Sequence, residues 1–534
     1  MQFLRYYNTV RFLRLEQVFF QVCYRLCSIM RRLLGLKHSY GHYRKGFPVA
    51  LAPLPARPAT MDSSKTVTFL NISHKFCGVW DERSHGDLWR YNLNYMDFLM
   101  QSSLTVEEGC AMIESFIDTA HTNGIADDPY PISLRGINWI KFVSLHKSVL
   151  GEEFLHKTDT FLYSQYRILS RRTERHLLAN HYLENAFSLL FAALYFRDSG
   201  FWKRASCIIS SQLPEQVLPD GAHFELSPMY HCIILERLLD CYNLLHSNAA
   251  VAFTGAEVLR VLMLDKARAM LSWLDAVAVG DTIPLLNDSA VNVALPTQAL
   301  RDYAIRLGIT WDKGCLVESG YRHVKKERYE AIIDMAPIGV SYNTGHSHAD
   351  TGTFLLWCGG APLIVDTGTS TYTACERRSY ERSTMAHNTV VVNGTSSSEV
   401  WGAFRCARRA TPVIFSDGPE CYSFSHDGYS ARGICCTRGF CCKEDSLEIT
   451  DTVECSTQAE CMAYFHLSPG TSVAGVTQGL VLTSKALFSF AGFTSVYVED
   501  VHVACEYNTL LPSKRICVAF KGNLKTTVSE FKVE

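Results

Sequence analysis

The sequence predicts a two-part fold, an all-α region followed by an all-β region. Between about residues 88 and 310, apolar residues recur at helical spacing in segments joined by short polar links. After about residue 325 the pattern changes to short β-rich runs separated by turn residues. Because helical and strand signals do not alternate, they indicate a helical toroid or bundle followed by an antiparallel β-sandwich of about 200 residues, not a βαβ fold.

The length of 534 residues is too great for one ordinary core. We predict three segments: residues 1–65, a basic helical segment with a connector; residues 66–322, the helical domain; and residues 323–534, the β-sandwich. The hydrophobic content of 47% and charged content of 19% are typical of a globular protein. The net charge of -2 provides no bulk attraction to nucleic acid, so we expect no nucleic-acid partner.

The first forty residues are basic and apolar, with seven Lys/Arg against one Glu. Arginines interrupt every apolar run, so neither a signal peptide nor a membrane span of about 20 residues fits. Two interpretations stay open: a helix packed on the following domain, and a basic amphipathic helix in peripheral contact with an anionic membrane. The proline-rich stretch "FPVALAPLPARPAT" then reads as an extended connector.

The helical and strand runs can be read directly from the chain. Helical periodicity is clearest in "TVEEGCAMIESFIDTAH", "HYLENAFSLLFAALYF", "MYHCIILERLLDCYNLL" and "AEVLRVLMLDKARAMLSWLDAV". In the β region, "TFLLWCGGAPLIVDTGT" holds two strands around a Gly-Gly turn, and "HNTVVVNGT" ends in Asn-Gly. The twenty cysteines are spread through these apolar segments and do not frame short loops, so we expect free thiols.

The stretch "TGHSHADTGTF" crowds polar residues at what reads as the start of a strand. Alternation would place His346, His348 and Asp350 on one face. His348 and Asp366 lie across one hairpin, and His387 supplies a further nitrogen, which matches a zinc-type ligand set. The alternative is that these histidines only bond to backbone groups. His346 is a candidate acid or base because imidazole titrates near neutral pH.

Two polar motifs occur in the helical region. In "NHYLEN", Asn180 and His181 can donate hydrogen bonds to a substrate carboxylate, while Glu184 can orient the histidine; the alternative is a set of helix caps. In "ELSPMYH", Ser227 and the proline after it signal a helix start. Tyr230 then falls in the first turn, where the helix dipole favours phenolate; the alternative is a packed tyrosine.

These motifs together resemble the heparinase II/III family of polysaccharide lyases over about residues 85 to 530. The resemblance is carried, in the family's order, by "LWRYNLNYMDFL", "PISLRGINWI", "ANHYLENAFSLLFAALYF", "DGAHFELSPMYH", "GDTIPLLNDSA", "GHSHADTGTF" and "RSYERSTMAHNTVVVNGTSSSE". It implies an incomplete (α/α) toroid joined to an antiparallel β-sandwich. It also implies β-elimination from a uronic acid of an acidic polysaccharide, with charge building on the uronate carboxylate.

The resemblance implies a role for each matching residue. Tyr230 is the catalytic acid and often also the base. Uronates occur as two epimers at C5, and His346 can be the base for one of them. The side chains of Tyr230 and His346 are therefore expected to converge on one groove. His181 matches the histidine of the family's "NHxxE" element, and Asn180 and Glu184 match its neighbours. The implied metal, usually zinc, has a structural role near the active site; its ligands are His348, Asp366 and His387, with His466 as the alternative third ligand.

Further candidates surround these motifs. Arg382 could grip a substrate carboxylate or sulfate bidentately, or form a structural ion pair. Arg135 and Asn138 could line the toroid cleft and contact substrate, while Trp139 is more simply explained as core.

Location and activity have alternatives. The resemblance implies the cell envelope or periplasm, whereas the lack of a readable signal peptide indicates the cytoplasm or a membrane surface. A glycoside hydrolase on the same toroid would need two acids, and Glu184, Glu225 and Asp288 are available. A catalytically inactive polysaccharide-binding or assembly protein is the non-enzyme alternative.

Overall fold

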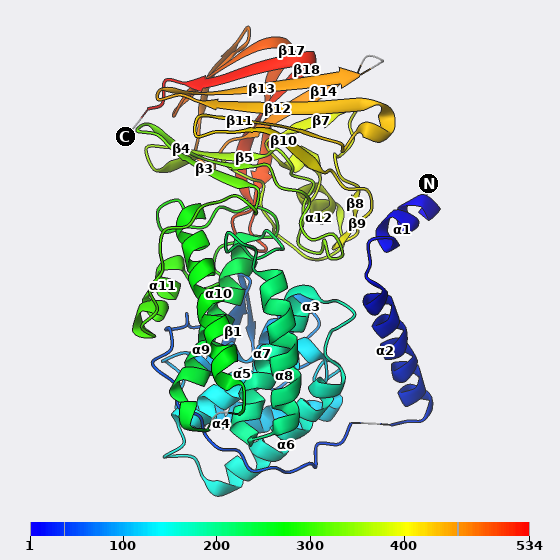
Figure 1. Cartoon of the computed structure of the whole chain (residues 1–534), viewed down its shortest axis with the longest axis vertical. Coiled ribbons are helices and arrows are strands. Elements are labelled where there is room, and N and C mark those ends of the chain that lie inside the picture. The colour runs from blue at the N-terminus through cyan, green and yellow to red at the C-terminus, as the bar shows by residue number, and fades with distance from the viewer. Residues whose placement is uncertain (1, 37, 252, 456–458, 533–534) are drawn as a thin grey trace.

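The computed structural model describes the chain apart from residues 1, 37, 252, 456–458 and 533–534, and has a helical part and a sheet part (Figure 1). Helices α3 to α11 form one half of the elongated molecule, and the large sheets form the other. The α-helices are α1 (Gln2–Val10), α2 (Leu15–Leu33), α3 (Asp87–Tyr95), α4 (Val106–Thr119), α5 (Pro129–Leu145), α6 (Glu152–Arg171), α7 (Ala179–Phe196), α8 (Ser199–Gln216), α9 (Pro228–Ser247), α10 (Ala256–Val277), α11 (Thr297–Arg306) and α12 (Glu376–Glu381).

The helical half is built from paired inner and outer helices. Consecutive helices α5 and α6, α7 and α8, and α9 and α10 pack together, while α5, α7 and α9 also contact one another in sequence. These inner helices are buried along nearly their whole length, whereas α6, α8 and α10 each keep an exposed face. An apolar sequence on every side suits the inner ring, and an amphipathic one suits the outer ring. This is the arrangement of an incomplete (α/α) toroid.

The sheet half is an antiparallel sandwich. A four-stranded sheet has the order β3-β4-β5-β6, and a ten-stranded sheet runs β10-β11-β12-β13-β18-β17-β16-β15, with β14 paired to β18 and β7. Its strands are β3 (Tyr321–Lys325), β4 (Tyr329–Asp334), β5 (Phe354–Cys358), β6 (Ala361–Ile364), β7 (Val390–Val392), β10 (Pro412–Asp417), β11 (Cys421–His426), β12 (Ile434–Cys442), β13 (Ser446–Cys455), β14 (Cys461–His466), β15 (Val473–Thr477), β16 (Leu480–Thr483), β17 (Leu487–Val503) and β18 (Leu511–Ser529). One buried apolar cluster draws residues from both sheets, as expected of a sandwich core.

Two short hairpins lie outside these sheets. They pair β1 (Thr66–Phe69) with β2 (Ile72–Lys75), and β8 (Val400–Trp401) with β9 (Arg405–Cys406). The β1–β2 hairpin belongs to the helical half, where Phe69 packs against Trp89 of α3.

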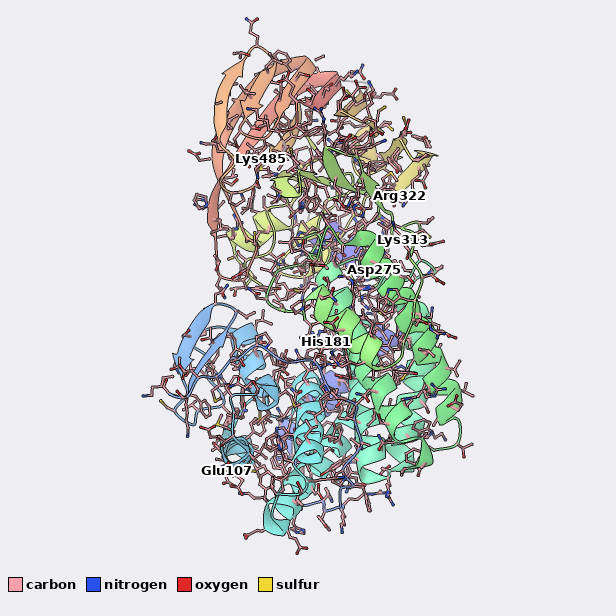
Figure 2. The ribbon with its side chains drawn as sticks, turned by 90° about the vertical axis from the view of Figure 1, so that its left-hand side faces the viewer. Glu107, His181, Asp275, Lys313, Arg322 and Lys485 are labelled. Carbon is pink, nitrogen blue, oxygen red and sulfur yellow. The ribbon has the colours of Figure 1, made fainter. Side chains whose placement is uncertain are left out.

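The two halves share a buried interface. Trp273 of α10, Tyr321 of β3 and Leu355 of β5 belong to one apolar cluster. The connection between β17 and β18 also reaches the helical half, because Val291 N donates to Cys505 O at 2.9 Å. In Figure 2, Asp275 of α10 and Arg322 of β3 lie near this border. Side chains from the two halves can therefore be held in fixed positions relative to one another.

Several sequence predictions can be compared with these elements. The Gly-Gly turn is confirmed, since Gly359 and Gly360 connect β5 to β6 with φ of 55° and 80°. All twenty cysteines are within the described residues and are free, as predicted. The sequence predicts that His346 and His348 lie at the start of a strand. This prediction is wrong, because residues 344–353 form a loop and β5 begins only at Phe354. Among the described helices, none is both long and apolar enough to span a bilayer.

Candidate active site

Tyr230 and His346 meet where the two halves join. Ser227 caps α9 by accepting a hydrogen bond from the Tyr230 backbone N at 3.2 Å, as the Ser-Pro signal predicts. The Tyr230 ring stacks on the His346 ring with centroids 3.8 Å apart. A second tyrosine, Tyr372, bridges them: its hydroxyl lies 3.3 Å from that of Tyr230 and 3.4 Å from His346 Nδ1. The expected convergence of the phenol and the imidazole is therefore confirmed.

Tyr230 is held as a neutral phenol. Burial raises the pKa of Tyr230 well above its usual value, and Tyr507 and Asp288 nearby raise it further. The expectation that the start of α9 favours phenolate is thus wrong, because a helix end contributes only about 0.3–1 kcal/mol, less than the desolvation of a buried charge. In the resting protein this side chain is a proton donor.

Asp288 connects the imidazole of this site to a second histidine. Its carboxylate lies 3.1 Å from His346 Nδ1 and 2.9 Å from His348 Nε2. Arg378 donates two further hydrogen bonds to the same carboxylate, at 2.5 and 2.8 Å. Burial alone would raise the pKa of Asp288, but Arg378 and the two histidines lower it well below its usual value. The carboxylate therefore stays ionised and fixes both imidazole rings.

Glu225 connects the same histidine to the start of α7. Its carboxylate accepts hydrogen bonds from the Asn180 backbone N at 3.0 Å and from Asn180 Nδ2 at 2.9 Å, so it caps a helix that lacks a capping side chain of its own. Glu225 Oε2 lies 3.7 Å from His346 Nε2. Asn180 Oδ1 is buried and has no hydrogen-bond partner among the described residues. The Glu225 carboxylate thus lies between Asn180 and His346.

Among the histidines predicted for the site, His181 is the most exposed, with 33% of its side chain accessible. Figure 2 shows it near mid-height of the molecule, in the helical half below the sheets. Its Nδ1 lies 3.2 Å from Glu174 Oε1, and its ring packs on Tyr130 with centroids 4.4 Å apart. Burial lowers the pKa of His181, but the Glu174 carboxylate outweighs this effect and raises it. A protonated His181 can bind an anion.

The backbone is strained where it delivers these side chains. Leu178, directly before α7, has φ of 59° and ψ of -149°, and Ala179 has φ of 50°. Leu226, next to Glu225, has φ of 58°, and Asn287, next to Asp288, has φ of 54°. Such conformations of non-glycine residues cost roughly 1–3 kcal/mol each and are typical of functional sites.

The histidine-rich loop also contributes to a candidate metal centre. His348, Asp366 and His387 are buried, and each offers one ligand atom within 4.8 Å of the others. Within the described part of the chain, His348 Nδ1 and His387 Nε2 have no hydrogen-bond partner. Burial lowers the pKa of His348 to about 4, so it is neutral, as metal binding requires. The residues therefore fit a cation, and the alternative ligand His466 is outside the cluster.

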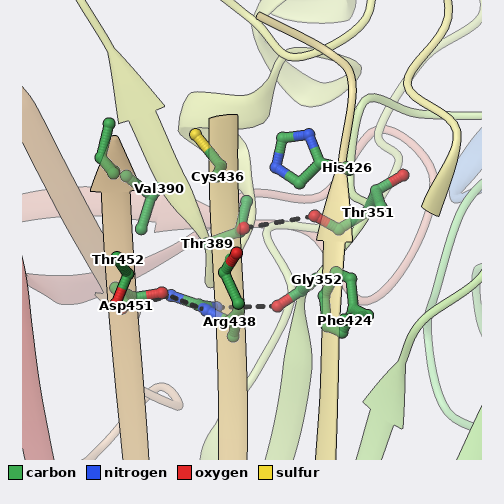
Figure 3. A pocket seen from close by; sticks show the side chains of 12 residues that line it. Thr351, Gly352, Thr389, Val390, Phe424, His426, Cys436, Arg438, Asp451 and Thr452 are labelled. Atoms are coloured by element: carbon green, nitrogen blue, oxygen red, sulfur yellow. Dashed lines mark hydrogen bonds and ion pairs between the residues drawn. The ribbon is translucent and has the colours of Figure 1, made fainter. Parts of the chain in front are cut away.

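A buried ion pair anchors the two loops that carry these histidines (Figure 3). Arg438 bonds the Asp451 carboxylate at 2.7 and 3.0 Å. The same guanidinium donates to Gly352 O at 2.7 Å and to Asn388 O at 2.6 Å, close in sequence to His348 and His387. Arg438 and Asp451, which line the small pocket drawn in Figure 3, thus support the loops of the candidate metal centre.

The structure corrects the predicted roles of four residues. Glu184 is buried and bonds Arg237 at 3.0 Å, so Glu174, not Glu184, orients His181. Arg382 is buried and donates to backbone carbonyls, including Ser347 O at 3.0 Å, and so stabilises the histidine-rich loop.

The other two corrections concern α5. Arg135 donates to Ala126 O at 2.7 Å and Asn138 to Tyr95 O at 2.9 Å, both within the core. The interpretation of Trp139 as core is confirmed, since this side chain is fully buried.

Sequence reasoning missed several members of the site. Asp288 and Glu225 were considered only as acids of a hydrolase, although each lies in a motif that carries the family resemblance. Tyr372 and Glu174 belong to no such motif, and no spacing indicated them. Both are brought to the site by loops, Tyr372 by the one between β6 and α12, and Glu174 by the one between α6 and α7.

The fold and the site define a class of protein in which an (α/α) toroid and an antiparallel β-sandwich meet at a tyrosine–histidine centre. Residues 130–304 match the family model described as heparinase II/III N-terminus, and residues 310–531 match heparinase II/III-like, C-terminal. The chain therefore belongs to the heparinase II/III family.

Individual relatives are distant. A heparin-sulfate lyase of Bacteroides stercoris is 24% identical over 248 residues, which are 40% of this chain and 35% of that protein. The solved structure of a heparinase III has a TM-score of 0.62 at 14% identity, covering 83% of this chain and 77% of that one. Heparan sulfate lyase HepC from Pedobacter heparinus has a TM-score of 0.56 at 18% identity, covering 85% and 78%. These structures share the fold.

Proposed function

We propose that the protein is a polysaccharide lyase that cleaves a uronic-acid-containing polysaccharide by β-elimination. The observation that carries the proposal is the contact between the Tyr230 phenol and the His346 imidazole, at 3.8 Å between ring centroids. Membership in the heparinase II/III family supports it, as do relatives named as lyases of heparin or heparan sulfate. We therefore infer that the substrate is an acidic polysaccharide with a uronate at the cleaved linkage.

Each side chain of the site is proposed to perform a different step of the elimination. A protonated His181 binds the uronate carboxylate, where negative charge builds as the C5 proton leaves. Asn180, whose Nδ2 donates to Glu225, positions the Glu225 carboxylate beside His346. Tyr230, as a neutral phenol, donates its proton to the departing O4. His346 accepts the C5 proton for one uronate epimer, and Asp288 holds its ring for this step. The products are one fragment with a new reducing end, which keeps O4 as its hydroxyl, and one fragment that ends in a C4–C5 unsaturated uronate.

A panel of uronate polysaccharides tests the proposal directly. The purified protein is incubated with heparan sulfate, alginate and bacterial envelope polysaccharides, and ultraviolet absorbance of an unsaturated uronate is followed. A lyase produces this absorbance from at least one polymer. Cleavage without it would identify a hydrolase, and binding without cleavage would identify the inactive polysaccharide-binding protein.

The structure gives little support to the hydrolase alternative. That mechanism needs one acid that holds a proton and a second that activates water or attacks the sugar. Glu184 pairs with Arg237, Glu225 caps α7, and Asp288 bonds Arg378, so all three acids already have structural partners.

Glu174→Gln is expected to change the pH profile of the lyase. Removing the carboxylate leaves burial as the main influence on His181, and so lowers the pKa of the imidazole. Because the protonated form binds the uronate, the alkaline limb of kcat/KM should move to lower pH, with little change at acidic pH. The measurement is kcat/KM against pH; Glu16→Gln, which removes a partly exposed partner of Arg175, is the control. An unchanged alkaline limb would contradict a role for imidazolium.

We propose that the His348–Asp366–His387 centre binds zinc. Two imidazole nitrogens and a carboxylate suit this ion, leaving a fourth position for water. When bound, zinc would cross-link the histidine-rich loop to the segments that carry Asp366 and His387. It would support the site without taking part in proton transfer.

Metal removal is expected to lower stability. A ligand that binds only the folded state at 100 to 1,000 times its Kd stabilises by about 2.7–4.1 kcal/mol, so a chelator should lower the Tm by roughly 5–15 °C. Elemental analysis should find about one zinc per chain before treatment. His348→Ala should have the lower Tm already and show no further response to chelator. An equal response of variant and parent would place the metal elsewhere.

A further inference from the structure

Helix α2 packs on the body of the protein through one face only. Gln17 is buried and donates to Leu177 O at 3.3 Å and to Tyr342 O at 3.4 Å. Tyr24 donates to Thr173 O at 2.7 Å. Figure 1 shows α1 and α2 along one edge of the molecule, apart from the helices of the toroid. The helix is therefore held in place while its outer face stays uncovered.

The outer face of α2 is a continuous apolar stripe. Six large apolar side chains are between 50% and 89% exposed: Leu15, Phe19, Val22, Leu26, Ile29 and Leu33. At about 100° per residue they fall within a sector of about 80°. In α1, Phe3, Tyr7 and Val10 are also between 52% and 84% exposed. A contiguous apolar surface of this kind marks an interaction site.

The charge beside the stripe is positive. Arg25 and Arg32 are exposed and lie next to the stripe on the helical projection. Glu16 is the single acid of α2, and it turns inward to bond Arg175 at 3.0 Å. The uncovered face therefore presents apolar and cationic groups with no acid between them.

We propose that α1 and α2 form a surface that binds an anionic lipid bilayer, with α2 lying in the plane of the interface. Apolar side chains enter the headgroup–acyl boundary, and the arginines pair with anionic headgroups. A second copy of the chain fits less well, because α2 packed on α2 would bring arginines together with no acids to pair them. Attachment would keep the protein at a membrane surface, whichever polymer it acts on.

Vesicle binding by the full chain tests the proposal. The probes are vesicles of pure phosphatidylcholine and of phosphatidylcholine mixed with phosphatidylglycerol, followed by flotation. We expect binding to the mixed vesicles, weakened by salt, and little binding to the neutral ones. The triple variant Phe19→Ser, Leu26→Ser and Ile29→Ser should bind at least about a hundredfold more weakly.

Two further variants complete the design. Arg25→Gln with Arg32→Gln should weaken binding by about thirtyfold. The control is Val258→Ser, Val413→Ser and Phe415→Ser, which removes apolar groups that are 56% to 75% exposed on other elements and should bind as the parent does. Circular dichroism and Tm establish that each variant is folded.

Three outcomes would overturn the proposal. These are absence of vesicle binding by the parent, binding that the α2 variants retain, and a concentration-dependent dimer in light scattering that the triple apolar variant abolishes. The last outcome would identify a second copy as the occupant. None of these measurements depends on lyase turnover, so they are independent of the proposed function.

Discussion

Tyr230→Phe is expected to lower kcat for unsaturated-uronate formation by about a thousandfold, because the departing O4 loses its proton donor. The change removes only a hydroxyl, and the aromatic ring can keep its stacking on His346. Among the described residues the hydroxyl has one hydrogen-bond partner, Tyr372 at 3.3 Å, so the loss of stability should be about 1 kcal/mol. KM should change little, because the phenol acts in the transition state and not in ground-state binding.

Tyr372→Phe is the matched control for this variant. It removes a hydroxyl from the same cluster, at 3.4 Å from His346 Nδ1, without removing the proposed acid. We expect a loss of about tenfold, which corresponds to misplacing a catalytic group by one weakened hydrogen bond. Equal losses of activity in the two variants would show that Tyr230 is not the specific proton donor. Full activity of Tyr230→Phe would exclude the mechanism.

The fold was readable from the sequence because its two halves have different periodicities. Outer helices such as α6 and α10 are amphipathic, and strands such as β13 alternate, so each gives a local signal. The inner helix α7 is apolar on nearly every side and shows only that it is buried. The choice between a bundle and a toroid therefore needed the family resemblance or the structure.

The site could be predicted only in part from the sequence, because some of its residues are positioned by local sequence and others by contacts that are distant in sequence. Tyr230 could be placed from its sequence, since Ser227 and Pro228 set the start of α9. His346 and His348 were predicted to have different tasks from the face of a strand that they were expected to share. They lie on a loop, and both rings are oriented by Asp288, which is distant in sequence.

Buried charge explains the wrong assignments. Arg135 was predicted to line the cleft, and Arg382 to grip a substrate anion or form a structural ion pair, yet both side chains are buried. Here their donors are satisfied largely by backbone carbonyls, such as Ala126 O and Ser347 O. Every residue has a backbone carbonyl, so the pattern of side chains in the sequence does not show where such a partner lies. The spacing of residues therefore could not distinguish a structural arginine from a ligand-binding one.

Asp288→Ala is expected to have the largest effect on stability of any single substitution at the site. It would leave the Arg378 guanidinium buried without its carboxylate, and removing one member of a buried pair costs about 3–5 kcal/mol. That loss should lower the Tm by roughly 6–20 °C. The measurement is thermal and denaturant unfolding at neutral pH, where the carboxylate of the parent is ionised.

The matched control is Asp417→Ala. Asp417 also receives a bidentate pair of bonds from an arginine, Arg322, but 38% of its side chain is exposed. Its removal should cost about 0–1 kcal/mol, because solvent can replace the carboxylate. A double variant, Asp288→Ala with Arg378→Leu, should recover part of the loss, since it removes the unpaired charge. Equal stability of the two single variants would contradict this account.

The pH dependence of the same group has a definite sign. Because the folded-state pKa of Asp288 lies below its unfolded value, the ionised carboxylate contributes stability at neutral pH, and this contribution is lost as pH falls through the acidic range. Asp288→Ala should therefore lose less stability than the parent on acidification. Asp288 contacts both His346 and His348, so the variant should lose the proposed lyase activity and the proposed zinc together. Loss of one without the other would show that the carboxylate does not couple the catalytic histidine to the metal centre.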